Sequence, residues 1–316
     1  MKYLKFLFAL FILLNTQASQ AQKTNQEFGF ITDNDLYVSF FLDKYYTNGL
    51  ELFYQFSTPM NYGNFTKKIR TIRVGQKMYN PYSSDVEYIY NQDRPYAGYL
   101  YANYTENFIN ARHILSIGVE TGVTGDKSLA REAQNFIHQF YKIDESNGWD
   151  TQVKQKYSFG LHASYIKNLW YKSEQKTQIS WINKAVFNSI FSTISSGLGI
   201  KFNLNKNNAI APIDNTTFYN TALQNKDENW VRECYFGIKS LIVYQLQDYT
   251  VTGELNNNYS QKSFDILPWV WTNDLGIYWN LKQWNLSYHQ IFQTSNVKNL
   301  KSNWIRYGSI EVSYKF

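Results

Sequence analysis

The heptapeptide LELFYQF, residues 50–56, alternates apolar and polar side chains with a period of two. Leu50 and Leu52 share one face of the strand that this pattern predicts, while Glu51 and Gln55 share the other. The same alternation returns in LSIGVE and in FGLHASY further along the chain. A strand that is apolar on one side and polar on the other can face lipid outside and a polar lumen inside.

Such stretches, bounded by turn-rich segments, predict twelve strands along the chain. They span 28–39, 47–58, 69–79, 96–106, 112–122, 157–169, 177–187, 193–203, 233–246, 269–280, 284–295 and 305–316. An even strand number is what single-chain outer-membrane barrels require. The last stretch, RYGSIEVSYKF, alternates up to the terminal Phe316. We therefore expect an all-β fold: a transmembrane antiparallel up-and-down β-barrel of about 12 strands.

The composition supports a membrane barrel. Aromatic residues make up 18% of the chain, with 27 Tyr and 22 Phe, and such rings are needed at both lipid–water boundaries of a barrel. The single Cys234 excludes an internal disulfide framework. The positive charge is modest and has no basic block, so it suits anionic lipid headgroups and predicts no nucleic acid partner.

The first 21 residues carry two lysines, an apolar run over 6–14 and small residues at Ser19 and Ala21. This order is typical of a secretory signal peptide with cleavage after Ala21. The apolar run is too short for a helical membrane anchor, which needs roughly 20 residues. The expected domains are therefore a signal peptide, 1–21, and one outer-membrane β-barrel domain, 22–316.

If the amino terminus starts on the periplasmic side, connections after odd-numbered strands lie at the cell surface. The longest of these spans 123–156 and contains AREAQNFIHQF, residues 130–140, whose pattern predicts a short helix in an outer loop. One inner connection, 204–232, is unusually long for a periplasmic turn, and its sequence offers no explanation.

Polar clusters occur at the outer ends of the predicted strands and in the first three outer connections. They are TDND at 32–35, YYTNG at 45–49, DRPYAGYLY at 93–101, AQNFIH at 133–138 and NGWDTQ at 147–152. Each alone also has a structural interpretation, because Asp and Asn favour turns and Asn-Gly suits a hairpin. The strand count, however, predicts that all of them gather at one rim of the barrel.

The helix adds a group that can transfer protons. Gln134 and His138 are four residues apart and therefore share one helical face. Ala133, Ile137 and Phe140 form an adjacent apolar strip that can pack against the barrel mouth. A helical His is often only a surface residue, but a helix held over a polar lumen favours a general base.

Taken together, these motifs resemble the outer-membrane lipid A 3′-O-deacylases of the LpxR type. The resemblance rests on NDLY, YYTNG, DRPYAGYLY, the Gln-x-x-x-His pair, GWDTQ and the closing RYGSIEVSYKF. It covers essentially all of the chain after the signal peptide. It implies a hydrolase that removes the ester-linked acyl chains at the 3′ position of lipopolysaccharide lipid A in the outer leaflet, with calcium dependence.

The resemblance also implies roles for individual residues. His138 matches the general base, and Gln134 matches its helical companion. Asn34 and Asp35 match a polar pair on the first strand, with Asp35 as a calcium ligand, and both can share one site only if the strand ends irregularly. Thr47 matches the hydroxyl residue that opens the second strand. Arg94 is assigned to a basic segment before the fourth strand.

Two rival functions are open at this stage. One is a non-catalytic barrel, either a narrow pore or an adhesin, which needs no polar cluster at the rim. The other is an outer-membrane phospholipase with a serine nucleophile, although the chain contains no GxSxG elbow. Because a closed barrel needs no partner subunit, we expect a monomer.

Overall fold

The computed structural model describes residues 25–38, 45–82, 91–141, 148–171, 176–205, 210–223, 233–255 and 263–316. The predicted signal peptide, 1–21, lies outside the described residues. Among the described residues, no helix is long and apolar enough to cross a membrane.

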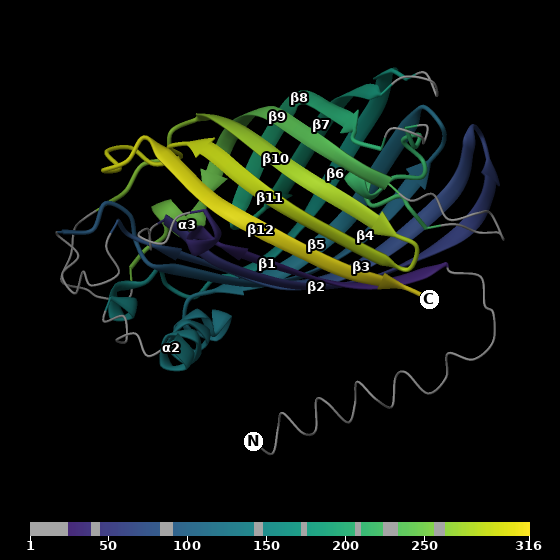
Figure 1. The fold of residues 1–316 in the computed structure, drawn as a ribbon. Coiled ribbons are helices and arrows are strands. Elements are labelled where there is room, and N and C mark those ends of the chain that lie inside the picture. The colour runs from purple at the N-terminus through teal and green to yellow at the C-terminus, as the bar shows by residue number, and fades with distance from the viewer. Residues whose placement is uncertain are drawn as a thin grey trace.

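Twelve antiparallel strands form a closed barrel in which each strand pairs with its neighbours in the sequence, and β1 pairs with β12. They are β1 (Gln26–Asn34), β2 (Tyr45–Tyr62), β3 (Phe65–Asn80), β4 (Ala97–Ile109), β5 (His113–Thr124), β6 (Tyr157–Trp170), β7 (Thr177–Asn188), β8 (Phe191–Asn203), β9 (Glu233–Asp248), β10 (Trp269–Leu281), β11 (Trp284–Thr294) and β12 (Trp304–Lys315). The predicted fold class is confirmed, and the strands lie tilted around the barrel (Figure 1).

The two faces of the strands differ as the alternation predicts. On β2, Leu50 and Leu52 are 49% and 46% exposed on the outer face, where lipid replaces water. Glu51 lies inside the barrel, where it pairs with Arg73 and accepts a hydrogen bond from the Tyr101 hydroxyl. The outer wall is therefore apolar, and the lumen holds paired polar groups.

Except for the connection between β8 and β9, short inner turns join the strands at the end that carries both described termini (Figure 1). Except for the tight turn between β7 and β8, the connections at the opposite end are longer. These outer connections contain most of the described helical segments. They are the 3₁₀ turns η1 (Asp35–Tyr37), η3 (Asp126–Ser128) and η4 (Trp149–Thr151), and the α-helices α2 (Ala130–Tyr141) and α3 (Tyr249–Thr252). The predicted helix is confirmed within one residue at its end.

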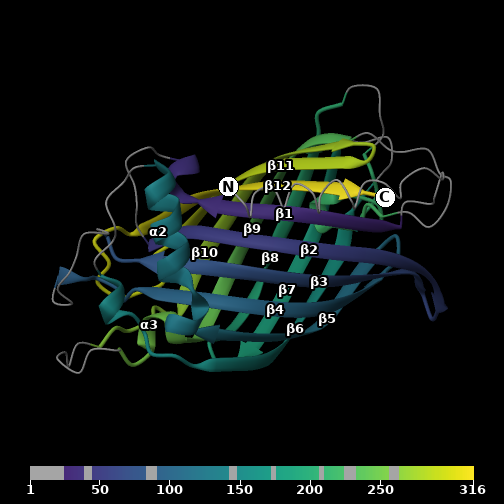
Figure 2. The same cartoon turned by 90° about the horizontal axis from the view of Figure 1, so that it is seen from below.

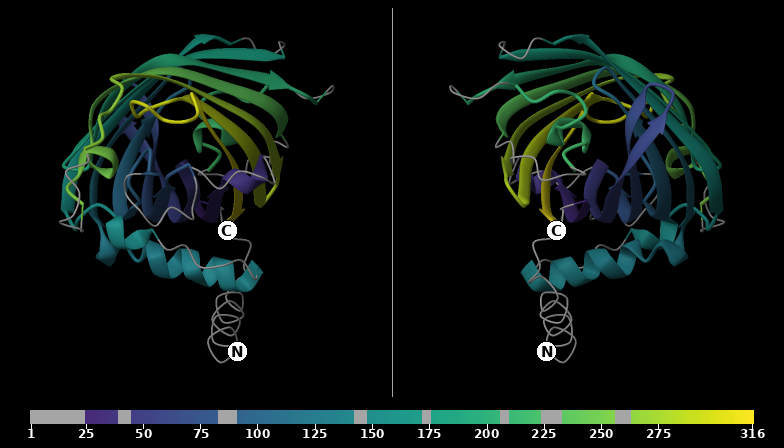
Figure 3. Two further views of the ribbon diagram at one scale, coloured as in Figure 1. Left: turned by 90° about the vertical axis from the view of Figure 1, so that its left-hand side faces the viewer. Right: turned by 90° about the vertical axis from the view of Figure 1, so that its right-hand side faces the viewer.

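The long inner connection between β8 and β9 folds back into the barrel. Its described part, 210–223, includes η5 (Thr217–Tyr219) and appears in green inside the ring of strands in Figure 3. Ile213 and Leu223 from this segment pack with isoleucines of five strands. Those isoleucines are Ile69, Ile109, Ile114, Ile166 and Ile182. We call 210–223 the inner plug.

Two lysines from the barrel wall hold the inner plug. The Lys67 ammonium donates to the carbonyl oxygens of Thr221, at 2.7 Å, and Leu223, at 3.0 Å, and also to that of Asp214. Lys201 is fully buried and donates to the Ala211 carbonyl at 2.7 Å. Carbonyl oxygens that would otherwise be buried without a partner are thus satisfied. This explains why the connection is longer than a turn.

Candidate functional site on the outer wall

One row of residues crosses β1 to β4 on the outside of the barrel near its outer end. Asn34 pairs with Asn48, Asn48 with Met78, and Met78 with Gly98. Their neighbours in sequence, among them Asp33, Gly49, Lys77 and Tyr99, line the luminal cavity. Because adjacent strand residues point to opposite faces, the row itself faces outward. We call these four residues the outer-wall row.

Helix α2 begins on this row. Gly98 has no side chain, and a methyl group there would overlap Ser128 Oγ and Ala130 Cβ. Met78 packs with Ala130 at the start of the helix, in a buried apolar cluster that also contains Trp149. The glycine therefore provides the space in which α2 approaches the wall.

From this start α2 runs across the strands on the outside of the barrel, as the views in Figures 2 and 3 agree. It contacts β4 and β3. His138 is eight residues beyond Ala130, about 12 Å along the helix axis. Since neighbouring strands are about 4.8 Å apart, this distance covers two to three strands and brings His138 over β2 and β1. These are the strands that carry Asn48 and Asn34.

Gln134 and His138 occupy the wall-facing side of α2. Gln134 is fully buried and His138 is 7% exposed, whereas Phe136 on the opposite side is 73% exposed. The Gln134 side-chain amide nitrogen lies 3.5 Å from His138 Nε2. The predicted pairing of these two residues on one helical face is therefore present in the structure.

The opposing side of the site is built where β1 and β2 become irregular. Asn34 ends β1 and caps η1, with its Oδ1 accepting from the Leu36 amide at 2.7 Å. Its Nδ2 donates to Asn48 Oδ1 at 2.6 Å. Asp35 starts η1 and is 2% exposed. The strand end between Asn34 and Asp35 is the irregularity that the sequence required for both to share a site.

Thr47 lies at a register shift between Tyr46 and Asn48 in the pairing of β2 with β3. Its side chain is fully buried, and its Oγ1 has no hydrogen-bond partner among the described residues. A buried hydroxyl without a partner costs free energy, so this oxygen is a candidate for binding a ligand.

The expectation that the helix lies over the polar lumen is wrong. Helix α2 lies against the outer wall instead, because Gly98 and Met78 face outward and provide its seat. In the predicted apolar strip, Ala133 packs on the cluster at that seat. The side chain of Phe140 lies outside the described residues.

Arg94 does not join the other predicted site residues, because it lies on the luminal side of the wall. Its guanidinium is 1% exposed and stacks 4.6 Å from the centre of the Tyr79 ring. Its Nη2 lies 3.4 Å from Thr250 Oγ1. Burial lowers the pKa of Arg94, and the nearby Asp248 carboxylate opposes this effect. The barrel wall therefore separates Arg94 from Gln134 and His138.

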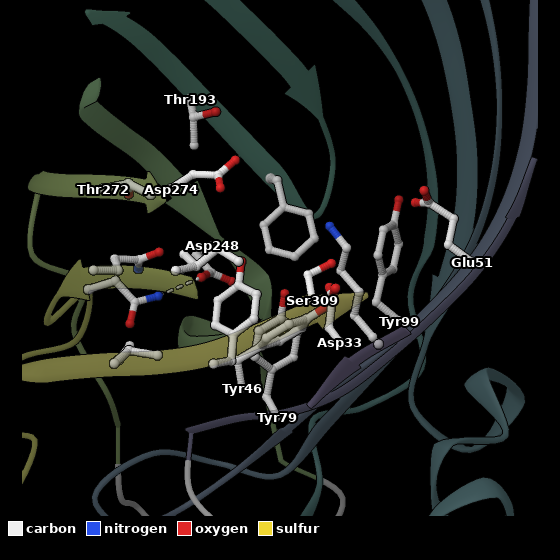
Figure 4. A pocket seen from close by; sticks show the side chains of 18 of the residues that line it. Asp33, Tyr46, Glu51, Tyr79, Tyr99, Thr193, Asp248, Thr272, Asp274 and Ser309 are labelled. Atoms are coloured by element: carbon white, nitrogen blue, oxygen red, sulfur yellow. Dashed lines mark hydrogen bonds between the residues drawn. The ribbon is translucent and has the colours of Figure 1, made fainter. Parts of the chain in front are cut away.

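Arg94 lines a cavity of about 580 Å³ in the outer half of the lumen. Figure 4 shows Asp33, Tyr46, Tyr79 and Asp248 turned toward it. The Tyr46 hydroxyl donates to Asp33 Oδ2 at 2.6 Å. The Asp33 side chain thus faces the lumen, while that of its sequence neighbour Asn34 faces the outer wall.

Two strand histidines, His162 and His289, lie in the lumen. His162 Nε2 lies 2.9 Å from Thr105 Oγ1, and His289 Nδ1 lies 2.8 Å from Asp274 Oδ1. Neither faces the outer-wall row. No group of three or more His, Cys, Asp or Glu residues that could hold a metal occurs among the described residues.

Comparison with known proteins identifies the family of this barrel. Residues 6–316 match the model of the family described as "Outer membrane protein LpxR". The chain belongs to the LpxR family. The structure of LpxR from Salmonella typhimurium matches with a TM-score of 0.73 and 15% identity, over 92% of this chain and 100% of that chain.

Other solved barrels match less well. The β domain of the Bordetella autotransporter BrkA has a TM-score of 0.46 and 9% identity, over 93% of this chain and 100% of that chain. The translocator domain of the autotransporter NalP from Neisseria meningitidis has a TM-score of 0.41 and 11% identity, over 100% and 97%. A comparison with curated protein sequences gives no match. The LpxR family and fold establish an outer-membrane protein.

Sequence reasoning missed two residues of this candidate site. Asn48 was interpreted only as part of a hairpin-like Asn-Gly, yet it hydrogen-bonds Asn34 across the strands. Trp149 lay in a noted cluster without a role of its own, yet its indole N–H donates to Gln134 Oε1 at 2.6 Å. A two-residue alternation reveals the face of Asn48, but nothing local in the sequence reveals the partner of Trp149.

Proposed function

We propose that this LpxR-family protein is an esterase that removes the ester-linked 3′-acyloxyacyl group of lipid A. The observation that carries the proposal is that α2 packs on β4 and β3 outside the barrel with Gln134 and His138 buried, and that its course leads toward the ends of β2 and β1, which carry Thr47, Asn34 and Asp35. A proton-transfer group, amide donors and a carboxylate in one place suit ester hydrolysis by water.

The position of the site matches a lipid substrate. Leu50, which is 49% exposed on the outer wall, lies two residues from Asn48 along β2, or about 7 Å toward the membrane interior. The site is thus immediately beyond the lipid-facing surface, at the outer end of the barrel. An ester linking acyl chains to a sugar headgroup lies at this boundary in the outer leaflet.

In the proposed reaction, the neutral His138 imidazole takes a proton from a water molecule as that water attacks the ester carbonyl carbon. The carbonyl oxygen gains negative charge, which amide donors of the wall, such as Asn34 Nδ2 on β1, would stabilise. The carbon–oxygen bond to the sugar then breaks, and His138 returns the proton to the sugar oxygen. The acyl chain leaves as a carboxylic acid, so no acyl-enzyme forms.

Calcium fits the donor chemistry of this corner. The Asp35 carboxylate, the unpartnered Thr47 Oγ1 and the Asn48 amide oxygen are all ligands that this hard cation prefers. When bound, calcium would supply positive charge beside the ester carbonyl. With a single carboxylate, we expect weak affinity, on the order of 10⁻⁴–10⁻³ M as in extracellular calcium modules.

The replacement His138→Ala tests the proposal. Lipid A from cells that express the wild-type protein should lack the 3′-linked acyloxyacyl mass, whereas the variant should leave lipid A intact. His162→Ala is the matched control, since His162 faces the lumen, and it should retain activity. Both variants should still run as heat-modifiable barrels in electrophoresis.

Other outcomes would reject the proposal. Acyl release that persists in the His138→Ala variant would exclude His138 as the base. Loss of activity with serine-directed inhibitors would instead support the serine phospholipase. Release of fatty acid from glycerophospholipids alone would show that these lipids, and not lipid A, are the substrate. Intact lipid A with the folded wild-type protein would favour a non-catalytic barrel.

A further inference from the structure

Trp149 packs between the candidate site and the neighbouring outer connections. Its side chain is 1% exposed, and its ring centre lies 5.2 Å from that of Tyr96. The backbone nearby is fixed, because the Val153 amide donates to the Tyr96 carbonyl at 3.0 Å. Thr151 Oγ1 also accepts from Gln92 Nε2 at 2.8 Å. These contacts hold the indole in one position relative to α2.

The indole determines which way the Gln134 amide points. Its N–H can only donate, and it lies 2.6 Å from Gln134, so the atom that faces it must be the amide oxygen. The amide nitrogen must then face His138 Nε2, at 3.5 Å. Asn and Gln side chains often leave this choice open, but here the donor-only partner decides it.

The amide orientation in turn determines the state of His138. An amide nitrogen only donates, so it can hydrogen-bond the ring nitrogen that faces it only where that nitrogen carries a lone pair. This contact therefore favours the tautomer with the ring proton on Nδ1. A proton on Nε2 would place two donors against each other. At 3.5 Å the contact is at the long limit of a hydrogen bond.

We infer that Trp149 is a positioning residue that holds the Gln134 amide in the orientation that keeps His138 Nε2 unprotonated. The inference rests on the proposed function for its effect on catalysis. The charged groups of η1, α2 and η4 are Asp35, Arg131, Glu132 and Asp150, whereas Glu51 of β2 and Lys77 of β3 line the luminal cavity. Arg131 and Asp150 pair with each other at 2.6 Å, so their charges offset.

Replacing the indole N–H would release the amide. In Trp149→Phe, Gln134 can rotate so that its oxygen faces Nε2, which stabilises a protonated ring. We expect the acidic limb of the kcat–pH profile to move to higher pH by roughly half a unit to one unit, with kcat lower by roughly three- to tenfold near neutral pH, as for one lost hydrogen bond.

Two companion variants separate positioning from packing. β-(3-Benzothienyl)alanine at position 149 keeps the shape of the indole but has no N–H, and it should reproduce the shift of the limb. Met78→Leu disturbs the same apolar cluster without touching this hydrogen bond, and it should leave the limb in place. The inference would be overturned if the acidic limb of the kcat–pH profile also moved in Met78→Leu. It would equally be overturned if the limb moved in neither variant at position 149.

A readout without substrate separates this inference from the proposed function. Nitrogen NMR of ¹⁵N-histidine-labelled protein in detergent should show His138 as the Nδ1–H tautomer in the wild type and a shifted equilibrium in Trp149→Phe. An unchanged signal would refute the positioning role. If the tautomer equilibrium of His138 shifted in Trp149→Phe but His138→Ala retained acyl release, the positioning role would stand and only the proposed function would fail.

Discussion

The unpartnered hydroxyl of Thr47 is the residue-scale feature with the clearest chemical meaning. It is fully buried at a bulge, beside the cross-strand bond between Asn34 and Asn48. Burying a polar atom at this position without a partner is unfavourable, which makes this oxygen a candidate ligand for the proposed calcium ion.

The isosteric replacement Thr47→Val tests this explanation. We expect unchanged or slightly higher thermal stability, because the buried unpaired hydroxyl disappears. Acyl release at limiting calcium should fall about tenfold, the effect of losing a contact with a charged group worth ~1.5 kcal/mol. Thermal unfolding measures the first effect, and activity over a calcium titration after chelation with EDTA measures the second.

Thr47→Ser is the control for this variant, since it keeps the hydroxyl and should keep the calcium response. A valine variant that is less stable but fully active would assign the hydroxyl to the fold alone.

Most of the site could be predicted at this scale, and the reasons for the failures are physical. Helical spacing alone put Gln134 and His138 on one face, and the family resemblance assigned Asn34 and Thr47. Arg94 could not be assigned to a face, because it lies in a connection without a two-residue period. Its position depends on contacts with Tyr79 and Thr250, which the sequence does not indicate.

At the scale of elements, the site depends on how α2 approaches the wall. The helix is short, and a helix of this length gains most of its stability from packing. That packing occurs at Gly98, where the absence of a side chain lets Ser128 and Ala130 reach the strand. The distance of His138 from the wall is therefore controlled from the other end of α2.

Gly98→Ala should move α2 without opening the barrel. The new methyl group overlaps Ala130 Cβ, so the helix must shift outward, and we expect acyl release to fall at least tenfold, since displacements near 1 Å can be that costly. Limited proteolysis should cut the 125–156 connection faster than in the wild type.

Gly122→Ala is the matched control, because its methyl group would meet the Tyr99 ring and the Leu100 carbonyl oxygen rather than any residue of α2. Equal proteolysis and activity in wild type and Gly98→Ala would show that the glycine does not position the helix.

The elements themselves were more predictable than their placement. Every predicted strand occurs, and differences are confined to the ends, as in β2, which extends four residues beyond the predicted 47–58 to Tyr62. Alternation gives strands directly, because one face meets lipid and the other meets the lumen. The amphipathic pattern of α2 shows that one face is buried but not whether it packs on the mouth or on the outer wall.

At the scale of the whole molecule, the barrel is filled rather than hollow. The inner plug, held by Lys67 and Lys201, occupies the inner end, and paired side chains such as Glu51 with Arg73 occupy the middle. The remaining cavity of about 580 Å³ lies in the outer half. This arrangement argues against the rival function of a pore.

Conductance measurements in planar bilayers should confirm the filled lumen. The wild type should show no open channels, and a variant in which a short turn replaces 210–223 should show ion-permeable openings. Lys77→Met changes a lysine that lines the cavity but does not hold the plug, so it should stay closed. Steady conductance in the wild type would contradict the plug.

Under the proposed function, the location of α2 on the outside of the barrel has a consequence for turnover. A substrate that meets the protein there never passes through it: it arrives by lateral diffusion, and both products can leave sideways along the same surface. The encounter rate then depends on the surface density and fluidity of the surrounding leaflet rather than on any bulk concentration. A barrel of this kind needs no entry channel, which leaves its interior free to serve stability.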